Sequence, residues 1–176
     1  MALKINENLT IALYKIEGGQ LNYEFTADFN ELSGESDSRF SNHIKVKAKV
    51  EKTGKDYLIW IEVYTTARLI CDRCGEEFNK KITEKITVLS SFKKHRGDCG
   101  ENENVKLLQN NARVISITQE VLDLLLLSIP QKILCKKDCK GLCSKCGVNL
   151  NQTTCQCKKN YTDPRWEKLK NIDFHD

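Results

Sequence analysis

The sequence predicts an α+β protein with an antiparallel β-sheet, one main packing helix and a C-terminal cysteine-rich zinc knuckle. Three observations predict this class: strand-like alternation up to about residue 92, one leucine-rich helical segment, and six of the nine cysteines between Cys135 and Cys157. With 176 residues, 40% of them hydrophobic and 30% charged, the chain is typical of a soluble protein with one good core. The expected division is a β-rich domain with its helix over 1–130, a zinc-knuckle module over 131–160, and a short helix or tail over 161–176.

Alternating residues predict the strands. In "IKVKAKV" (44–50) apolar residues alternate with lysines, which is typical of a strand with one face in water. A turn, "EKTGKD", separates it from "YLIWIEVYTTARLIC" (57–71), which is rich in β-branched and aromatic residues, so the two segments predict a hairpin. "EFNKKITEKITVLSSF" (77–92) adds one more long strand. The polar stretches 31–42 and 93–111 are expected to be loops.

The main helix is expected over 116–129, "SITQEVLDLLLLSI". Ser116 with Gln119, or Thr118 alone, can cap its start, and Pro130 ends it. One apolar face is expected to pack on the sheet, and its members are Val121, Leu122, Leu125, Leu126 and Ile129.

The cysteines predict metal binding and not disulfides. No signal peptide and no membrane-spanning segment is recognisable, so the expected location is the reducing cytoplasm, where structural disulfides are uncommon. The motif C-x-x-C-G occurs twice, as "CDRCG" (71–75) and "CSKCG" (143–147). In such a turn two thiolates converge on one metal, and the glycine can adopt a positive φ. Closed four-thiolate sites are the usual structural zinc arrangement, and neither common ferredoxin spacings nor a thioredoxin-like context occurs.

Eight of the cysteines are candidate ligands for one or two zinc ions. They are Cys71, Cys74, Cys135, Cys139, Cys143, Cys146, Cys155 and Cys157. The favoured arrangement gives the last four one site, because their short loops cost little entropy to close, and gives the first four another. The alternative gives the two C-x-x-C-G motifs one metal and the other four cysteines a second. Cys99, in a polar loop, is expected to be a bystander.

The net charge of +4 argues for no particular partner, because two zinc–tetrathiolate centres of charge −2 would bring it to about zero. A local lysine patch is the candidate contact with RNA or a protein partner; its members are Lys136, Lys137, Lys140, Lys145, Lys158 and Lys159. These lysines can contact phosphates or offset thiolate charge, and both roles stay open. No P-loop, Rossmann glycine pattern, G-x-S-x-G or H-E-x-x-H motif occurs, so neither an enzyme nor a small-molecule substrate is expected.

At "CDRCG", "CKGLCSKCGVNLNQTTCQC" and "DPRWEKL" the chain resembles the YceD family, the large ribosomal RNA subunit accumulation proteins. The resemblance covers roughly residues 60–172 and is most specific over 135–166, although Ser144 stands where relatives often have proline. It implies a non-enzymatic factor for the synthesis, processing or stability of large-subunit (23S-type) rRNA. The implied partner is large-subunit rRNA or a large-subunit ribosomal protein. Arg165 and Trp166, in the matching tail, join the candidate binding residues.

Two other functions compete with this one. A zinc-ribbon regulator would bind promoter DNA or a transcription protein, and crosslinking with sequencing separates it from an rRNA factor. A thiol oxidoreductase would cycle Cys71 and Cys74 in a two-electron reaction without metal, so tight zinc binding excludes it.

Overall fold

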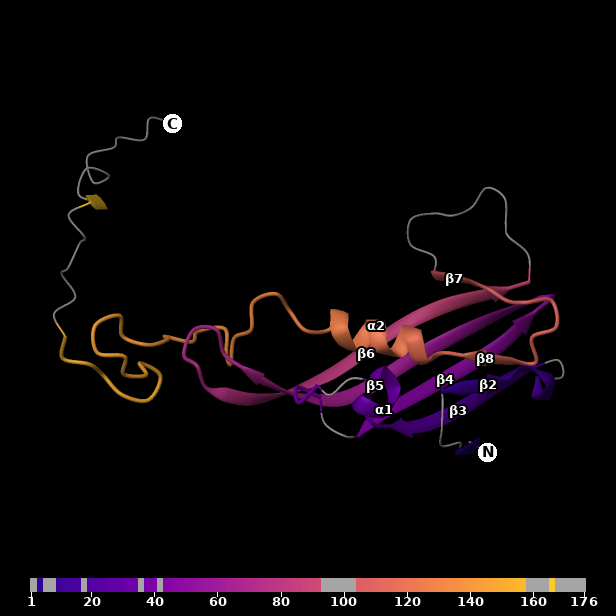
Figure 1. Cartoon of the computed structure of the whole chain (residues 1–176), viewed down its shortest axis with the longest axis horizontal. Helices are drawn as coiled ribbons and strands as arrows, with labels where there is room; N and C mark the ends of the chain where they lie inside the picture. The colour runs from indigo at the N-terminus through magenta and orange to yellow at the C-terminus, as the bar shows by residue number, and fades with distance from the viewer. Residues whose placement is uncertain are drawn as a thin grey trace.

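The computed structural model of the chain describes residues 3–4, 9–16, 19–34, 37–40, 43–92, 104–157 and 165–166. Six strands form a sheet in the order β1-β3-β4-β5-β6-β7 (Figure 1), and β2 pairs with β8 in a small second sheet. The six strands are β1 (Leu3–Lys4), β3 (Gln20–Ala27), β4 (Ile44–Thr53), β5 (Asp56–Ile70), β6 (Glu77–Ser91) and β7 (Asn104–Leu107). The other elements are β2 (Thr10–Ala12), the 3-10 turn η1 (Leu13–Lys15), α1 (Phe29–Ser33), β8 (Val114–Ser116) and α2 (Thr118–Leu127).

The fold agrees with the predicted α+β class. Strands β3 to β6 are antiparallel, whereas β1 pairs with β3, and β6 with β7, in parallel. The sheet is therefore mixed at its edges and not wholly antiparallel. In the described residues, no helix has the length and apolar character needed to cross a membrane.

The predicted hairpin is confirmed as β4 and β5, in a register that pairs Val46 with Val63 and Val50 with Ile59. Alternate residues of both strands are buried, as period-two patterning requires. The predicted third strand is β6, and its ladder with β5 runs from Tyr57–Ser90 to Ile70–Glu77. These two strands extend beyond the rest of the sheet, and the turn between them reaches the cysteine-rich segment (Figure 1). This long hairpin positions the candidate site.

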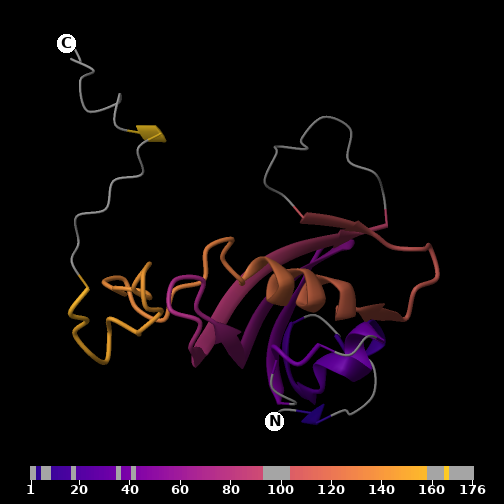
Figure 2. The same ribbon diagram turned by 60° about the vertical axis from the view of Figure 1, so that its left-hand side comes forward.

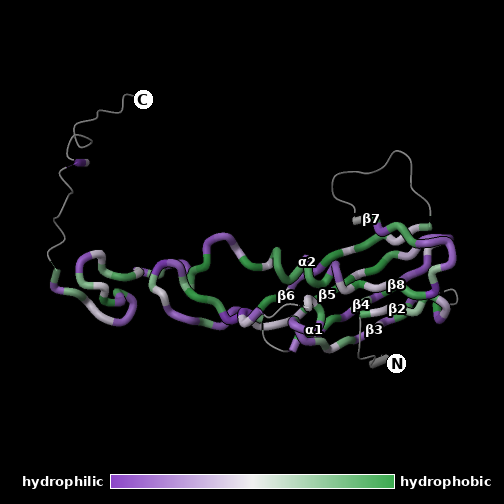
Figure 3. The backbone as a smooth tube through the Cα atoms, viewed as in Figure 1, coloured by the Kyte–Doolittle hydropathy of each residue, from purple (hydrophilic) through white to green (hydrophobic). Residues whose placement is uncertain are grey.

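One face of the sheet is covered by α2, which lies across it (Figure 2), and the core forms between them. Ile61 of β5 and Val121 and Leu125 of α2 have no exposed surface. Long hydrophobic stretches coincide with α2 and the middle strands, while the end of the β5–β6 hairpin is largely hydrophilic (Figure 3). The predicted packing face of the helix is wrong at Leu126, which is 48% exposed because it faces away from the sheet.

The predicted start of the helix is also corrected. The residue at the N-terminal cap is Ile117, and no side chain caps it. The Ser116 hydroxyl does accept a hydrogen bond from the Thr118 N–H, at 3.4 Å.

Both predicted loops contain regular structure. Residues 29–33 form α1, because the Asp28 side chain accepts the Asn30 N–H at 2.8 Å and so caps a short helix inside a polar stretch. Strand β7 lies within 93–111, where parallel pairing with β6 supplies hydrogen bonds that local sequence does not reveal. The rest of that segment up to residue 103, including Cys99, lies outside the described residues.

Candidate metal centres

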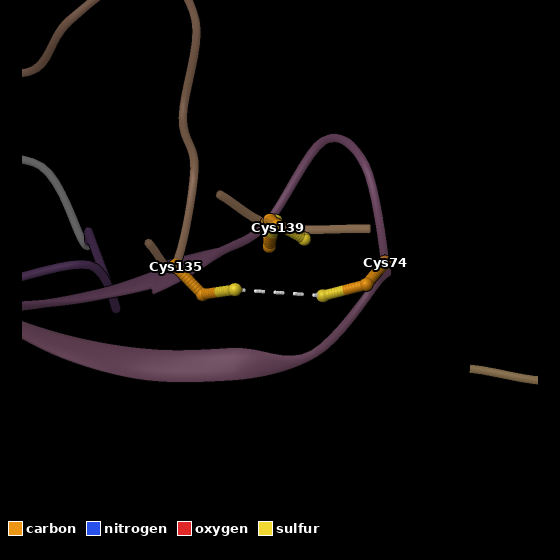
Figure 4. Close-up of side chains that lie close together, drawn as sticks. Cys74, Cys135 and Cys139 are labelled. Atoms are coloured by element: carbon orange, nitrogen blue, oxygen red, sulfur yellow. Dashed lines mark hydrogen bonds between the residues drawn. The ribbon is translucent and has the colours of Figure 1, made fainter. Parts of the chain in front are cut away.

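Four cysteine sulfurs meet at the end of the long hairpin. Cys71 directly follows β5 and Cys74 lies in the turn before β6, while Cys135 and Cys139 come from the segment after α2. The sulfurs of Cys71 and Cys139 are 3.8 Å apart, and those of Cys74 and Cys135 are 3.7 Å apart. All four lie within 4.8 Å of one another. Figure 4 shows three of these side chains directed toward one another from separate parts of the chain.

A second group is formed by Cys143, Cys146, Cys155 and Cys157, whose sulfurs also lie within 4.8 Å of one another. The sulfurs of Cys143 and Cys155 are 3.4 Å apart. The grouping is the favoured arrangement of the sequence analysis. The alternative, in which the two C-x-x-C-G motifs share a metal, corresponds to neither group. The first group joins distant parts of the chain, whereas the second is local.

The two C-x-x-C-G motifs fold into equivalent turns. In each, the N–H of the first cysteine donates to the carbonyl oxygen five residues later, at 2.9 Å. The glycine N–H then donates to the carbonyl oxygen of the first cysteine, at 2.8 Å for Gly75 and 2.9 Å for Gly147. Both glycines have the predicted positive φ, 71° and 72°. Only glycine adopts this conformation readily, so the residue after the second cysteine sets the geometry of the turn.

The sulfur geometry fits a tetrahedral metal ion. A zinc ion with four Zn–S bonds of about 2.3 Å requires sulfur atoms about 3.8 Å apart, and the first group has separations of 3.7 and 3.8 Å. A disulfide needs sulfurs about 2.05 Å apart, and all eight thiols are free. Four protein sulfurs leave no open position for water or substrate, so such a centre is structural and not catalytic.

Electrostatics in the first group favour a bound cation. Burial raises the pKa of the Cys71 thiol, but the backbone N–H groups of Cys135, Arg73 and Cys74 outweigh it and lower the pKa to about 6. Burial, followed by the sulfurs of Cys139 and Cys74, raises the pKa of Cys135 to about 12. Ionising all four thiols therefore requires a positive charge among them, which a divalent metal supplies.

In the second group, too, the pKa of one thiol is lowered and that of another is raised. The backbone N–H groups of Cys146 and Lys145 lower the pKa of Cys143 to about 6. A hydrogen bond with Cys146, and then burial, raise the pKa of Cys157 to about 12. Because a metal ion binds thiolates, protons would compete with it, and either group would bind a metal more tightly as the pH rises.

Asn151 connects the two groups. It lies in the loop of the second group, yet its side-chain Nδ2 donates to the Cys139 sulfur of the first group at 3.2 Å. Its Oδ1 accepts the backbone N–H of Lys140 at 2.9 Å, and its own N–H donates to Asn149 Oδ1 at 2.9 Å. Such hydrogen bonds to a ligand sulfur orient it and stabilise its charge.

A second connection forms between Gly141 and Arg73. The Leu142 N–H donates to the Arg73 carbonyl oxygen at 3.3 Å, and the Arg73 guanidinium donates to the Cys139 carbonyl oxygen. Gly141 has a φ of 75°, and a Cβ added there would lie 2.9 Å from the Arg73 carbonyl oxygen. Only glycine allows the chain to pass this close to the hairpin turn.

Replacing Asn151 by aspartate is expected to weaken zinc binding at the first centre by roughly ten- to hundredfold, because the sulfur loses a donor and gains a negative neighbour. Competition with a chromogenic chelator measures this affinity. Thr154→Asp is the matched control, since it adds the same charge to an exposed position of the same loop. Equal affinities for the two variants would contradict the role of Asn151.

The structure places the other predicted binding residues at the surface. Lys136, Lys137, Lys140 and Lys145 are exposed, as are Arg165 and Trp166, the last at 59%. Lys158, Lys159 and the remainder of the tail lie outside the described residues. Sequence reasoning gave neither Arg73 nor Asn151 a contact with the first cysteine group, because no local pattern shows how the hairpin turn and the two cysteine groups dock.

Comparisons with known proteins agree on one family. The family described as "Large ribosomal RNA subunit accumulation protein YceD" matches residues 60–173. A chloroplastic YCED homolog 1 of Arabidopsis thaliana is 26% identical over 135 residues, covering 62% of this chain and 42% of the relative. The homolog of Zea mays is 44% identical over 45 residues, covering 25% and 15%. An uncharacterized protein of Mycobacterium tuberculosis is 27% identical over 122 residues, covering 69% and 58%.

The chain spans about half the length of the first curated relatives it matches, 42% of the Arabidopsis thaliana protein and 58% of the mycobacterial one. No solved structure is significantly similar to this chain.

Proposed function

This chain belongs to the YceD family of large ribosomal RNA subunit accumulation proteins, and on that premise we propose that it is a non-enzymatic ribosome-biogenesis factor. Its role is to promote the synthesis, processing or stability of large-subunit rRNA. The named relatives in Arabidopsis thaliana and Zea mays carry the same description. The partner is large-subunit rRNA, a large-subunit ribosomal protein, or both. The proposed place of action is the cytoplasm, a reducing compartment in which thiols stay available for metal.

We further propose that each group of four cysteines holds a structural zinc ion. The observation that supports this most strongly is the first group, where sulfurs separated by 61 and 68 positions in the chain lie 3.7 and 3.8 Å apart. Thiolates from such distant positions lose much conformational freedom on meeting, and a metal with four bonds offsets that loss. When bound, zinc supplies a rigid cross-link and no reactive position.

The contacts with the partner are then made by lysines next to the metal ligands. Cys135 and Cys139 attach the segment after α2 to the hairpin, and Lys136 and Lys137 lie between these two ligands. Lys140 follows directly and is held by Asn151. Because the ligands on either side fix the backbone, the lysines are presented from a rigid loop. Phosphate groups of RNA are the partner chemistry that such a surface favours.

Depleting the protein in its own cells is expected to lower large-subunit rRNA relative to small-subunit rRNA. Quantitative hybridisation or sequencing of total RNA measures the ratio, and the wild-type chain supplied from a plasmid should restore it. An unchanged ratio after verified depletion would contradict the proposed function.

Crosslinking followed by sequencing separates this function from a zinc-ribbon regulator. Enrichment of large-subunit rRNA is the expected result, whereas enrichment of promoter DNA would support the regulator instead. A reversible two-electron titration of Cys71 and Cys74 in the metal-free chain, with no zinc in the native protein, would support a thiol oxidoreductase.

A further inference from the structure

A lysine-lined hollow lies beside the first cysteine group, on the side of the sheet that α2 covers. Its volume is about 180 Å³. Leu69 of β5 and Phe78 of β6, which pair across the hairpin, form an apolar floor. Four lysines line it: Lys80 of β6 and Lys132, Lys136 and Lys137 of the segment after α2. None of the described residues that line it is acidic. We call this site the lysine hollow.

The lysine hollow is assembled by contacts between segments. The Asp72 N–H donates to the Ile133 carbonyl oxygen at 2.8 Å, and the Asp72 carboxylate accepts the Ile133 N–H at 2.6 Å. These two bonds fix the chain next to Lys132 on the hairpin turn. At the other end of the segment the Cys139 N–H donates to the Lys136 carbonyl oxygen at 3.2 Å. These hydrogen bonds fix the backbone of the segment after α2, so that its lysines lie close to Lys80 of β6.

The lysines of this hollow differ from several basic residues on the open face of the sheet, which form ion pairs with carboxylates. On the open face of the sheet Lys47 pairs with Glu24 at 3.6 Å and Lys85 with Glu62 at 2.6 Å, and Arg68 pairs with Glu77. A larger hollow of about 480 Å³ on that face is lined by both carboxylates and lysines. In the lysine hollow, by contrast, none of the four lysines forms an ion pair with any residue that the structure describes.

We propose that the lysine hollow binds one nucleotide of a single-stranded RNA segment, with the phosphates on the lysines and the ribose or base on the Leu69–Phe78 floor. The inference rests on the proposed function for the choice of RNA over other polyanions. Clustered ammonium groups with no carboxylate partner attract phosphates. The apolar floor gives the uncharged part of a nucleotide a surface to cover, as in other single-strand sites.

The size of the hollow favours single-stranded RNA over a duplex. About 180 Å³ corresponds to roughly six water molecules in liquid volume. This is less than the roughly 300 Å³ at which pockets for whole small molecules begin. The space is too small for a whole nucleotide but takes the base or ribose of one, while its phosphates stay outside on the lysines. A base that enters the hollow must leave its stack. Unpaired RNA allows this, whereas a duplex resists it.

The test compares two double variants that each remove two charges. Lys80→Gln with Lys132→Gln changes the hollow, yet neither lysine lies between two cysteine ligands. Lys52→Gln with Lys55→Gln is the matched control at the opposite end of β5, which has 15 residues and so is about 50 Å long. Zinc content and thermal melting should be the same in both. Fluorescence anisotropy with a labelled single-stranded oligouridylate, over a range of salt concentrations, gives the affinity.

The hollow variant is expected to bind about tenfold more weakly. The slope of log Kd against log salt concentration should fall by about 0.7 for each phosphate that the variant no longer neutralises. The control variant should match the wild-type chain in both measurements. Equal weakening in the two variants would overturn the inference, as would tighter binding of duplex RNA than of oligouridylate.

The outcomes of this test and of the depletion test are separable. If the wild-type chain restores large-subunit rRNA but does not bind oligouridylate, the inferred RNA site is wrong and the proposed function stands. If the hollow variant loses RNA binding but depletion leaves rRNA unchanged, the RNA site stands and the proposed function is wrong.

Discussion

Replacing Cys139 by serine is expected to cost the chain one of two zinc ions and to release the segment after α2 from the hairpin. Cys139 is 2% exposed and its sulfur lies 3.8 Å from that of Cys71. Among the described residues, no further histidine, cysteine, aspartate or glutamate belongs to this group. Structural zinc sites contribute an apparent binding free energy of about 10–16 kcal/mol, far more than a single packing contact. This substitution should therefore have a larger effect than any that removes a single packing contact.

Zinc analysis of the purified variant, together with limited proteolysis, measures this result. One zinc ion per chain should remain, because the second group draws all four ligands from residues 143–157. Cleavage within 131–139 should become faster. Cys99→Ser provides the control, as a cysteine expected to bind no metal. Full zinc content in Cys139→Ser, or loss of zinc in Cys99→Ser, would contradict the assigned ligands.

Replacing Gly141 by alanine is expected to lower the free energy of unfolding of the zinc-loaded chain by about 2–4 kcal/mol. Two effects add. A φ of 75° is unfavourable for alanine, and its Cβ would lie 2.7 Å from Arg73 Cγ and 2.9 Å from the Arg73 carbonyl oxygen. The Arg73 side chain can move aside, but the Arg73 carbonyl oxygen belongs to the C-x-x-C-G turn, where Cys74 is the next residue, so its movement would displace Cys74.

Gly147→Ala separates the two effects. Gly147 has nearly the same φ, 72°, but a Cβ there meets no atom within 4 Å. Its replacement should lower the free energy of unfolding by only about 1 kcal/mol. Denaturant titrations, followed by zinc release as well as by circular dichroism, measure both variants. Equal losses would show that Gly141 is needed for its φ alone and not for close contact with the hairpin.

The sequence predicted those parts of the fold whose signals are local. Alternation predicted β4 and, less strictly, β6, because a strand that buries one face of a sheet has a period-two pattern, and β-branched and aromatic residues predicted β5. Short spacing within residues 143–157 favoured the grouping that the second set of sulfurs adopts. The two glycines after C-x-x-C have the positive φ that their position in the motif predicted.

Features that depend on distant segments were not predictable. Leu126 has the spacing of a core residue, but α2 buries a narrower face, so it is 48% exposed. Strand β7 exists because it adds to the edge of β6, and nothing in "NVKL" alone indicates this. The contact between Asn151 and the Cys139 sulfur depends on how the two cysteine groups dock. In the sequence Lys80 is an ordinary lysine of a strand. Only the fold places it beside the lysines of the segment after α2.

The docked arrangement of the two cysteine groups gives each proposed metal centre a separate role. The first centre attaches the loop to the hairpin, and the second holds Asn151 against the first. Among the described residues, the buried cluster at the first group is small: it consists of Cys71, Cys74 and Cys139, with Phe78, Leu134 and Cys135 packed against it. The proposed metal bonds would stabilise these segments as apolar burial stabilises the sheet, which is usual for small modules.

Both proposed centres, and the lysine loop that they fix, require that the native chain holds two zinc ions, each bound by four cysteine sulfurs. X-ray absorption at the zinc edge, combined with metal analysis of protein purified without added zinc, tests it most directly. The expected result is two zinc ions per chain and a first coordination shell of four sulfur atoms at about 2.3 Å. A shell containing nitrogen or oxygen, or fewer than two zinc ions per chain, would contradict it.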